Sequence, residues 1–434
     1  MATGGLANVL HAVPFRSDWL YYVGLIFFFL NLVLYVVIWS MLLTRFVSYP
    51  ATFRASLVHP TESLFVPAFV VSLGTICITI VEYGANNAGQ WLTKTVLVVF
   101  WINVALAMAL SITIYMILWS SLTFTIAQMT PIWIFPAYPL LIIGPHAANL
   151  SAKLYNPTDA LQVIVGGFTV QGIGFLVSLT IYSAFVYRLM TQKLPADPSR
   201  PGMFVSVGPA AFTCSGTIGM ASNLHRALVR GSDTTTQMFM DVPADLAANI
   251  LRIVANWCSL WLWGLAIWFF FVSVISNIAP LYTHKRQKVS VEGKSEDGRE
   301  HTHVVQVQRI PFAMTWYSYI FPQTALTTAT FRVAEAFEIH ALNVLGCVMT
   351  GLLVALWFFV VTMMIRAIML KHILWPEKGE DREEGGFMRP RTAQGETKNR
   401  GDIEVRGAGV PAGTDVERNG PGTRHWPWIT EQRA

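Results

Sequence analysis

Hydroxyl and amide side chains within apolar, proline-containing segments are the residues of this sequence best suited to chemistry. The segments Leu64–Val81, Met203–Leu224 and Pro311–Phe331 contain no Asp, Glu, Lys or Arg, whereas a proton relay or a cation site would place a carboxylate within a bilayer. Hydroxyls, amides and backbone groups exposed at kinks can solvate an anion weakly, and weak binding allows rapid passage. The candidates to line such a path are Ser72, Thr75, Thr213, Ser215, Gln323, Thr324, Thr327 and Thr328.

These side chains have a second interpretation, because hydroxyls and amides also join neighbouring membrane helices through hydrogen bonds. Helical spacing places Gln323 and Thr327 on one stripe, and Thr324 and Thr328 on a neighbouring stripe. Each residue is open to both interpretations.

Few ionisable side chains accompany these segments. His146, within Pro131–Leu150, either titrates and assists an anion or packs as a hydrogen-bonded histidine. Arg226 and Arg332 lie near the predicted outer ends of segments, where they either attract anions or form a solvated rim. The pair His301-Thr-His303 lies in a polar stretch, for which a solvated loop is a better interpretation than a metal site.

An aromatic residue or a glycine stands directly before proline at several places. The pairs are Phe135-Pro136, Gly144-Pro145, Gly208-Pro209 and Phe321-Pro322. Proline inside a helix removes a backbone hydrogen bond and kinks the helix. A phenylalanine beside a kink either closes a narrow path, as in hydrophobic gating, or fills the packing gap that the kink leaves.

Soluble-type active sites are not indicated. The sequence contains no phosphate loop, nucleophile elbow or metal-ligand motif at convincing spacing. The four cysteines all fall within apolar runs, so a disulfide framework is not expected. Basic residues after Lys371 are balanced by acidic ones, which argues against nucleic-acid binding. We expect no enzyme activity, no cofactor and no metal.

Composition places the candidate residues in a membrane. Of the 434 residues, 53% are hydrophobic and 13% are charged, about half the usual charged share. Several apolar runs have the length of about 20 residues that a spanning helix needs. The clearest runs are Trp19–Leu43, Val96–Trp119, Leu161–Tyr187, Trp257–Ile278 and Val344–Ile368.

Weaker segments alternate with these runs, and they alone contain proline. They are Leu64–Val81, Pro131–Leu150, Met203–Leu224 and Pro311–Phe331. With the short opening stretch Ala2–Val13 they bring the total to about ten membrane segments. Carbonyls that proline frees are tolerated in lipid only where protein or water satisfies them. We therefore predict an all-α protein of helical hairpins, with kinked helices inside and proline-free helices outside.

The remaining segments are polar. Loops on the side of Arg45–Pro60 carry more Lys and Arg than those on the opposite side, which predicts that they and the C-terminus are cytoplasmic. Residues 284–308 are expected to form a charged cytoplasmic loop. Residues 1–370 would then be the transmembrane domain, and residues 371–434 a disordered cytoplasmic tail with too little apolar content to fold.

Several motifs resemble those of the fungal malate permeases. The match is collinear over residues 1–381, and the wider group is the tellurite-resistance/dicarboxylate transporter family, with fungal sulfite efflux pumps and plant guard-cell anion channels. The motifs are Thr3-Gly-Gly5 with Val13-Pro-Phe-Arg16, Arg45-Phe46 with Tyr49-Pro50, Pro131-Ile-Trp-Ile-Phe-Pro136, Arg200-Pro-Gly-Met-Phe204 with Val207-Gly-Pro209, Trp316 and Tyr319 before Phe321-Pro322, and Trp375-Pro-Glu-Lys-Gly-Glu-Asp381.

The resemblance implies ten helices as five hairpins around a central pore, with the odd-numbered helices inside. It implies a pore phenylalanine in the ninth helix, at which Phe321 matches. It also implies a plasma-membrane protein, a homotrimer by analogy, and malate, other C4-dicarboxylates, chloride, nitrate or sulfite as cargo. We expect the path to be lined also by Thr3, Gly4, Phe135, Pro136, Pro139, Gly208, Pro209, Phe212 and Pro322.

The chain also departs from the family pattern. The family has half a helix before the Thr-Gly-Gly motif, so we expect a truncated first helix. Gln323 stands where malate permeases tend to have Asn, although the threonines after it fit the malate branch. We therefore expect a malate-like anion transporter or channel embedded in lipid. A sulfite exporter or inorganic anion channel is the alternative within transport, and a membrane enzyme or a non-transporting scaffold is the alternative outside it.

Overall fold

The long apolar runs form helices that extend beyond the runs at both ends. In the computed structural model they are α2 (Asp18–Ser48), α6 (Gln90–Ser121), α8 (Pro157–Gln192), α10 (Ala244–Thr283) and α12 (His340–Met369). Large apolar side chains such as Trp261 and Met190 are exposed on these helices, and only 17% to 33% of each apolar stretch is buried. Such a surface suits lipid rather than water.

The structure describes residues 1–370 except Arg16, 59–61, 122–125, 127–128, 230–237 and 284–311. The predicted loop 284–308, with the His301-Thr-His303 pair, and the predicted tail 371–434 lie outside the described residues. Within the described part, eight helices are long and apolar enough to cross a membrane. The prediction of an all-α polytopic membrane protein is confirmed.

The proline-bearing segments also form helices, and each changes its geometry near a proline. The 3₁₀ helices η2 (Pro131–Ala137), η3 (Asp197–Ser206) and η4 (Met314–Tyr319) lead into α7 (Tyr138–Ser151), α9 (Val207–Leu228) and α11 (Phe321–Ala336); α4 (Glu62–Phe65) precedes α5 (Ala68–Ala88). Pro139 and Pro322 lie in the first turns of α7 and α11, where a missing N–H costs no helical hydrogen bond.

Burial separates the two kinds of helix. The apolar stretches that contain α5, α7 and α9 are 61%, 89% and 94% buried, in contrast to the long helices. The helices α1 (Ala2–Ala12) and α11 do not count among the eight long apolar helices, but they too are largely buried. Proline-bearing helices are thus enclosed by protein, where freed carbonyls find partners.

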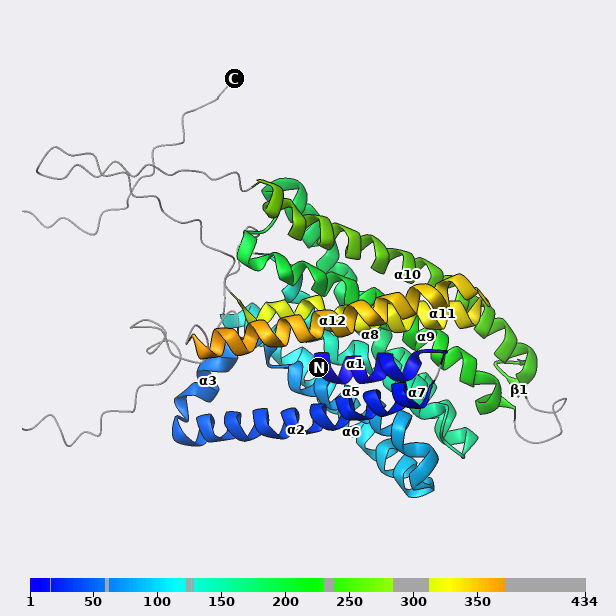
Figure 1. The fold of residues 1–434 in the computed structure, drawn as a ribbon. Helices are drawn as coiled ribbons and strands as arrows, with labels where there is room; N and C mark the ends of the chain where they lie inside the picture. The colour runs from blue at the N-terminus through cyan, green and yellow to red at the C-terminus, as the bar shows by residue number, and fades with distance from the viewer. Residues whose placement is uncertain are drawn as a thin grey trace, which may run out of the picture. The chain divides into compact units, whose positions relative to one another are not determined.

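Helix contacts follow a simple order (Figure 1). Each of α1, α5, α7, α9 and α11 contacts the next, and α11 contacts α1, so that the contacts close a cycle. Each of the five also contacts the long helix that follows it in the chain. The remaining described elements are α3 (Ala51–Val58) and an antiparallel pair of short strands, β1 (Met238–Phe239) and β2 (Val242–Pro243).

The turn before α9 shows how a kink is accommodated. Pro209 has no N–H to donate to the carbonyl of Val205, four residues earlier. The hydroxyl of Tyr138, on α7, donates to that carbonyl instead, and the hydroxyl of Tyr182, on α8, donates to the carbonyl of Ser206. A side chain at Gly208 would overlap the Tyr138 hydroxyl, so the Gly-Pro pair both frees a carbonyl and admits its new donor.

Two proline-bearing helices run further than their apolar segments, and this corrects one expectation. The helix α5 continues past Val81 to Ala88, and α11 continues past Phe331 to Ala336. These largely buried helices therefore contain charged residues, although the segments predicted from the sequence contained none. The residues are Glu82 in α5 and Arg332 and Glu335 in α11. Hydropathy ended the segments at the first charged residue, whereas backbone hydrogen bonding continues for one or two turns.

Candidate substrate path

One narrow cavity touches all five helices of the contact cycle. Its volume is about 30 Å³, enough for about two water molecules. The lining residues are Gly5 and Asn8 of α1, Thr75, Ile78 and Glu82 of α5, Ile142, Pro145 and Asn149 of α7, Phe212 and Ser215 of α9, and Phe321, Thr324, Ala325 and Thr328 of α11.

The polar part of this lining consists mostly of hydroxyls held by their own helices. Thr75 donates to the carbonyl of Ser72 at 2.8 Å, and Thr328 donates to that of Thr324 at 2.9 Å. Thr324 likewise donates to the carbonyl of Phe321 at 2.6 Å. A hydroxyl proton rotates freely, so the same group can donate to an anion in the cavity. These hydroxyls lower the cost of desolvating an anion without binding it tightly.

Aromatic rings occupy the end of the cavity at which α9 and α11 begin. The ring centroids of Phe212 and Phe321 are 5.4 Å apart, and Phe321 is only 4% exposed. Tyr138 lies 6.1 Å from Phe321, and Phe135 stacks on Tyr138 at 5.0 Å. The motifs Phe135-Pro136, Gly208-Pro209 and Phe321-Pro322 thus lie near one aromatic cluster at the junctions between 3₁₀ and α-helix, whereas Gly144-Pro145 lies inside α7.

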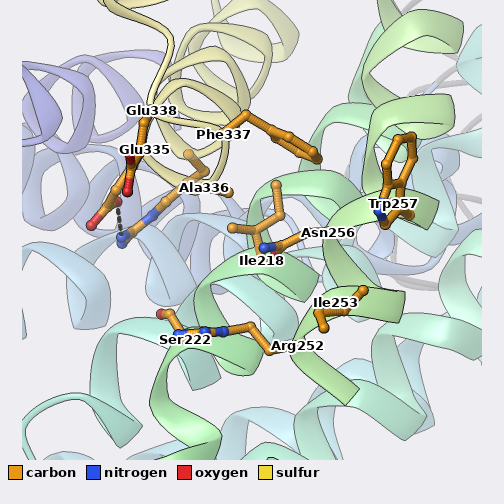
Figure 2. A pocket seen from close by; sticks show the side chains of 11 residues that line it. Ile218, Ser222, Arg252, Ile253, Asn256, Trp257, Glu335, Ala336, Phe337 and Glu338 are labelled. Atoms are coloured by element: carbon orange, nitrogen blue, oxygen red, sulfur yellow. Dashed lines mark hydrogen bonds and ion pairs between the residues drawn. The ribbon is translucent and has the colours of Figure 1, made fainter. Parts of the chain in front are cut away.

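The C-terminal parts of α9 and α11 and the N-terminal part of α10 surround a larger cavity of about 450 Å³ (Figure 2), called the outer cavity after the predicted outer ends of α9 and α11. Arg332 forms an ion pair with Glu335 at 3.3 Å, and Figure 2 shows Arg252 extending toward Ser222. The lining of this cavity therefore contains two arginines and two glutamates, whose formal charges balance. The lining residues are Ile218, Ser222, Arg252, Ile253, Asn256, Trp257, Arg332, Glu335, Ala336, Phe337 and Glu338.

Comparison with known proteins agrees with this architecture. The model of the SLAC1 family, described as voltage-dependent anion channel, matches residues 1–365. The chain belongs to this family. The Malic acid transport protein of Schizosaccharomyces pombe is 26% identical over 382 residues, which cover 88% of this chain and 79% of the relative.

Other relatives in this anion-channel family carry different names. A Sulfite efflux pump of Arthroderma benhamiae is 22% identical over 361 residues, covering 83% of this chain and 86% of the relative. An uncharacterized transporter of Methanocaldococcus jannaschii is 22% identical over 373 residues, covering 85% of this chain and 91% of the relative. These relatives are named as a pump and a transporter, which is consistent with membrane transport.

In this SLAC1-family chain, the cavity brings together some predicted path residues and not others. Thr75, Phe212, Phe321, Thr324 and Thr328 line it, with Ser215. Ser72 and Pro139 lie one helical turn before the lining residues Thr75 and Ile142. The buried residues Phe135, Pro136, Gly208, Pro209 and Pro322 lie at or beside the helix junctions and are not in the lining.

Helix rotation leaves five predicted path residues outside the lining of the cavity. Thr3 accepts a hydrogen bond at 3.1 Å from the indole N–H of Trp357, on α12. Gly4 packs between Asn31, on α2, and the hydroxyl of Thr75, on α5, and Gly5 rather than Gly4 lines the cavity. Three further predictions, Thr213, Gln323 and Thr327, are buried but are not among the lining residues.

Two predicted ionisable residues have structural partners. His146 is fully buried with its ring 5.0 Å from that of Phe100, on α6, and it lines neither cavity. Neither ring nitrogen has a hydrogen-bond partner among the described residues, so His146 packs without the expected hydrogen bond. Arg226, predicted at the outer mouth, donates to the carbonyls of Ser151 and Leu154 at 2.7 and 3.2 Å. It connects the end of α9 to the turn after α7, whereas Arg332 lines the outer cavity.

Sequence reasoning missed Asn8, Asn149 and Glu82 in the lining. Asn8 follows Gly5 by three residues and Asn149 follows Pro145 by four, so each shares a helix face with another lining residue. Neither Gly5 nor Pro145 was itself predicted to line the path, so this spacing gave no signal. Glu82 follows Ile78 by four residues. It was missed because the apolar segment was ended at Val81.

Proposed function

We propose that the chain carries small organic anions, foremost malate and other C4-dicarboxylates, along a path enclosed by α1, α5, α7, α9 and α11. One observation carries the proposal: a single cavity is lined from all five helices, and its polar lining is mainly hydroxyl and amide. The family match and the malic acid transport relative support an anion as cargo. The path requires no ATP site and no cofactor.

Phe321 is the proposed gate of this path. Its ring lines the cavity and lies against that of Phe212, which supports a closure at this point of the path. A passing anion would have to displace these rings or pass them without its hydration shell, and both routes raise the barrier. We further propose a plasma-membrane location with a cytoplasmic C-terminus, and a homotrimer by analogy with the family.

Sulfite is the second candidate cargo, since relatives named sulfite efflux pump match most of the chain at 21% to 22% identity. Purified protein in liposomes separates the possibilities. Labelled malate, sulfite and chloride are loaded in turn, and uptake is compared with that of empty liposomes. We expect malate uptake to exceed sulfite uptake. The absence of flux for every anion, from protein that elutes as a single folded species, contradicts transport.

In the outer cavity, neutralising Glu335 and neutralising Arg332 should change the apparent KM for malate in opposite directions. Glu335→Gln removes the carboxylate that screens Arg332 and should lower the apparent KM for malate about two- to threefold, because local anion concentration follows the potential at the mouth. Arg332→Gln should raise the KM by a similar factor.

Both shifts should shrink at high ionic strength. Arg366→Gln is the matched control. Arg366 is exposed near the C-terminal end of α12, whereas Glu338 of the outer cavity lies just before the N-terminal end of that helix. Uptake is measured against malate concentration at low and high salt. A shift of the same sign for Glu335→Gln and Arg332→Gln would show that the mouth acts through packing rather than charge.

A further inference from the structure

One buried amide crosses from an outer helix to the wall of the cavity. Gln171 lies on α8, a helix that is mostly exposed, yet its own side chain is 1% exposed. It occupies a slot between α7 and α9 that two glycines create. A Cβ at Gly144 would overlap the Gln171 amide, and one at Gly216 would lie 2.7 Å from its Oε1. The Gln171 side chain therefore fills the space that side chains at Gly144 and Gly216 would otherwise occupy.

The amide holds a backbone group that belongs to the cavity wall. Nε2 of Gln171 donates to the carbonyl of Phe212 at 2.7 Å. The hydroxyl of Ser215 donates to the same carbonyl at 3.1 Å. Phe212 and Ser215 both line the cavity, and the Phe212 ring contacts that of Phe321. Contacts thus connect Gln171, on α8, through the Phe212 carbonyl to the rings of Phe212 and Phe321, which form the constriction of the proposed path.

Packing alone does not account for an amide at this position. Oε1 of Gln171 is buried and accepts no hydrogen bond from the described residues. A buried acceptor without a donor is unfavourable, whereas an apolar side chain of similar size would fill the slot without that cost. The hydrogen bond to the Phe212 carbonyl is the feature that an apolar residue would lose.

We infer that Gln171 is a positioning residue for the constriction: from α8, it fixes the turn that carries Phe212 and so holds the Phe212 ring against Phe321. The inference rests on the proposed transport function and on the proposed gate. It assigns to an outer helix a part in setting the width of the path.

The first test replaces the amide by an apolar side chain of similar size. Gln171→Leu should raise anion conductance in planar bilayers about two- to tenfold, the factor that corresponds to one net hydrogen bond, at unchanged yield and oligomeric state. Gln162→Leu is the matched control, because Gln162 lies on the same helix and is exposed. Unchanged or lower conductance of an assembled Gln171→Leu protein overturns the inference.

A second variant separates the hydrogen bond from the packing of the slot. Gly144→Ala alone should reduce the yield of folded protein, since its methyl group overlaps the amide. Gln171→Ala combined with Gly144→Ala removes the overlap and refills part of the slot, but it lacks the donor. The double variant should recover yield and still show raised conductance. Wild-type conductance from this protein would show that the hydrogen bond has no positioning role.

The third test asks whether Gln171 acts through the Phe212 ring. Phe212→Ala keeps the carbonyl but removes the ring, so Gln171→Leu should add no further increase in that background. Effects that multiply contradict the inference. Wild-type protein is measured first: flux without any effect of Gln171→Leu refutes this inference alone, whereas a wild type that passes no anion refutes the proposed function.

Discussion

Phe321→Ala is expected to raise anion conductance about tenfold, which corresponds to a barrier lowered by about 1.4 kcal/mol. Phe321 is buried, lines the cavity, and lies against the ring of Phe212. Its removal leaves a gap at the narrow end of the path, which water and anions can enter. Conductance is measured in planar bilayers with malate and with chloride, at equal amounts of assembled protein.

Phe331→Ala is the matched control for the gate. Phe331 is equally buried, at 4% exposure, and lies on the same helix, but it packs against Gly346 on α12 and does not line the cavity. We expect Phe331→Ala to lower thermal stability, as large-to-small core changes do, without raising conductance. If both variants raise conductance equally, loosened packing rather than a gate explains the effect.

Gly208→Ala is expected to lower the free energy of unfolding by about 3 kcal/mol, because overpacking costs about 1–3 kcal/mol and the loss of a buried hydrogen bond costs about 1 kcal/mol more. The added methyl group displaces the Tyr138 hydroxyl. The carbonyl of Val205 then loses the hydrogen bond from Tyr138, and Pro209 has no N–H with which to replace it. Thermal unfolding of the purified protein in detergent measures the loss.

Gly172→Ala provides the control substitution. Nothing lies within 4 Å of a Cβ at Gly172, so this change should be neutral or slightly stabilising through helix propensity. Tyr138→Phe in the Gly208→Ala background should cost less than the two separate changes together, since both remove the same hydrogen bond. Full additivity would contradict the proposed contact.

The fold was predictable from the sequence because lipid imposes a simple rule. A run of about 20 apolar residues forms a helix, and α2, α6, α8, α10 and α12 all follow from such runs. The ends of helices did not follow, since backbone hydrogen bonding does not stop at the first charged residue. Glu82 and Arg332 were therefore placed outside helices that contain them.

The site was predictable only in part, because helix rotation depends on neighbours. Spacing identified two stripes on α11, and the cavity contains Thr324 and Thr328 but not Gln323. The role of Arg226 depends on carbonyls more than 70 positions away in the chain. Gln171 is joined to Phe212 across 41 positions, and nothing in the local sequence marks that partner.

The tyrosine donors before α9 have a consequence for biosynthesis. The carbonyls of Val205 and Ser206 depend on hydroxyls from α7 and α8, both of which leave the ribosome before α9 does. An α9 that entered lipid alone would lack these two hydroxyl donors at its start, where no water replaces them. The helices α7 and α8 carry these hydroxyls and are synthesised first, so we expect them to be inserted before α9 and to supply the two hydrogen bonds as α9 packs against them.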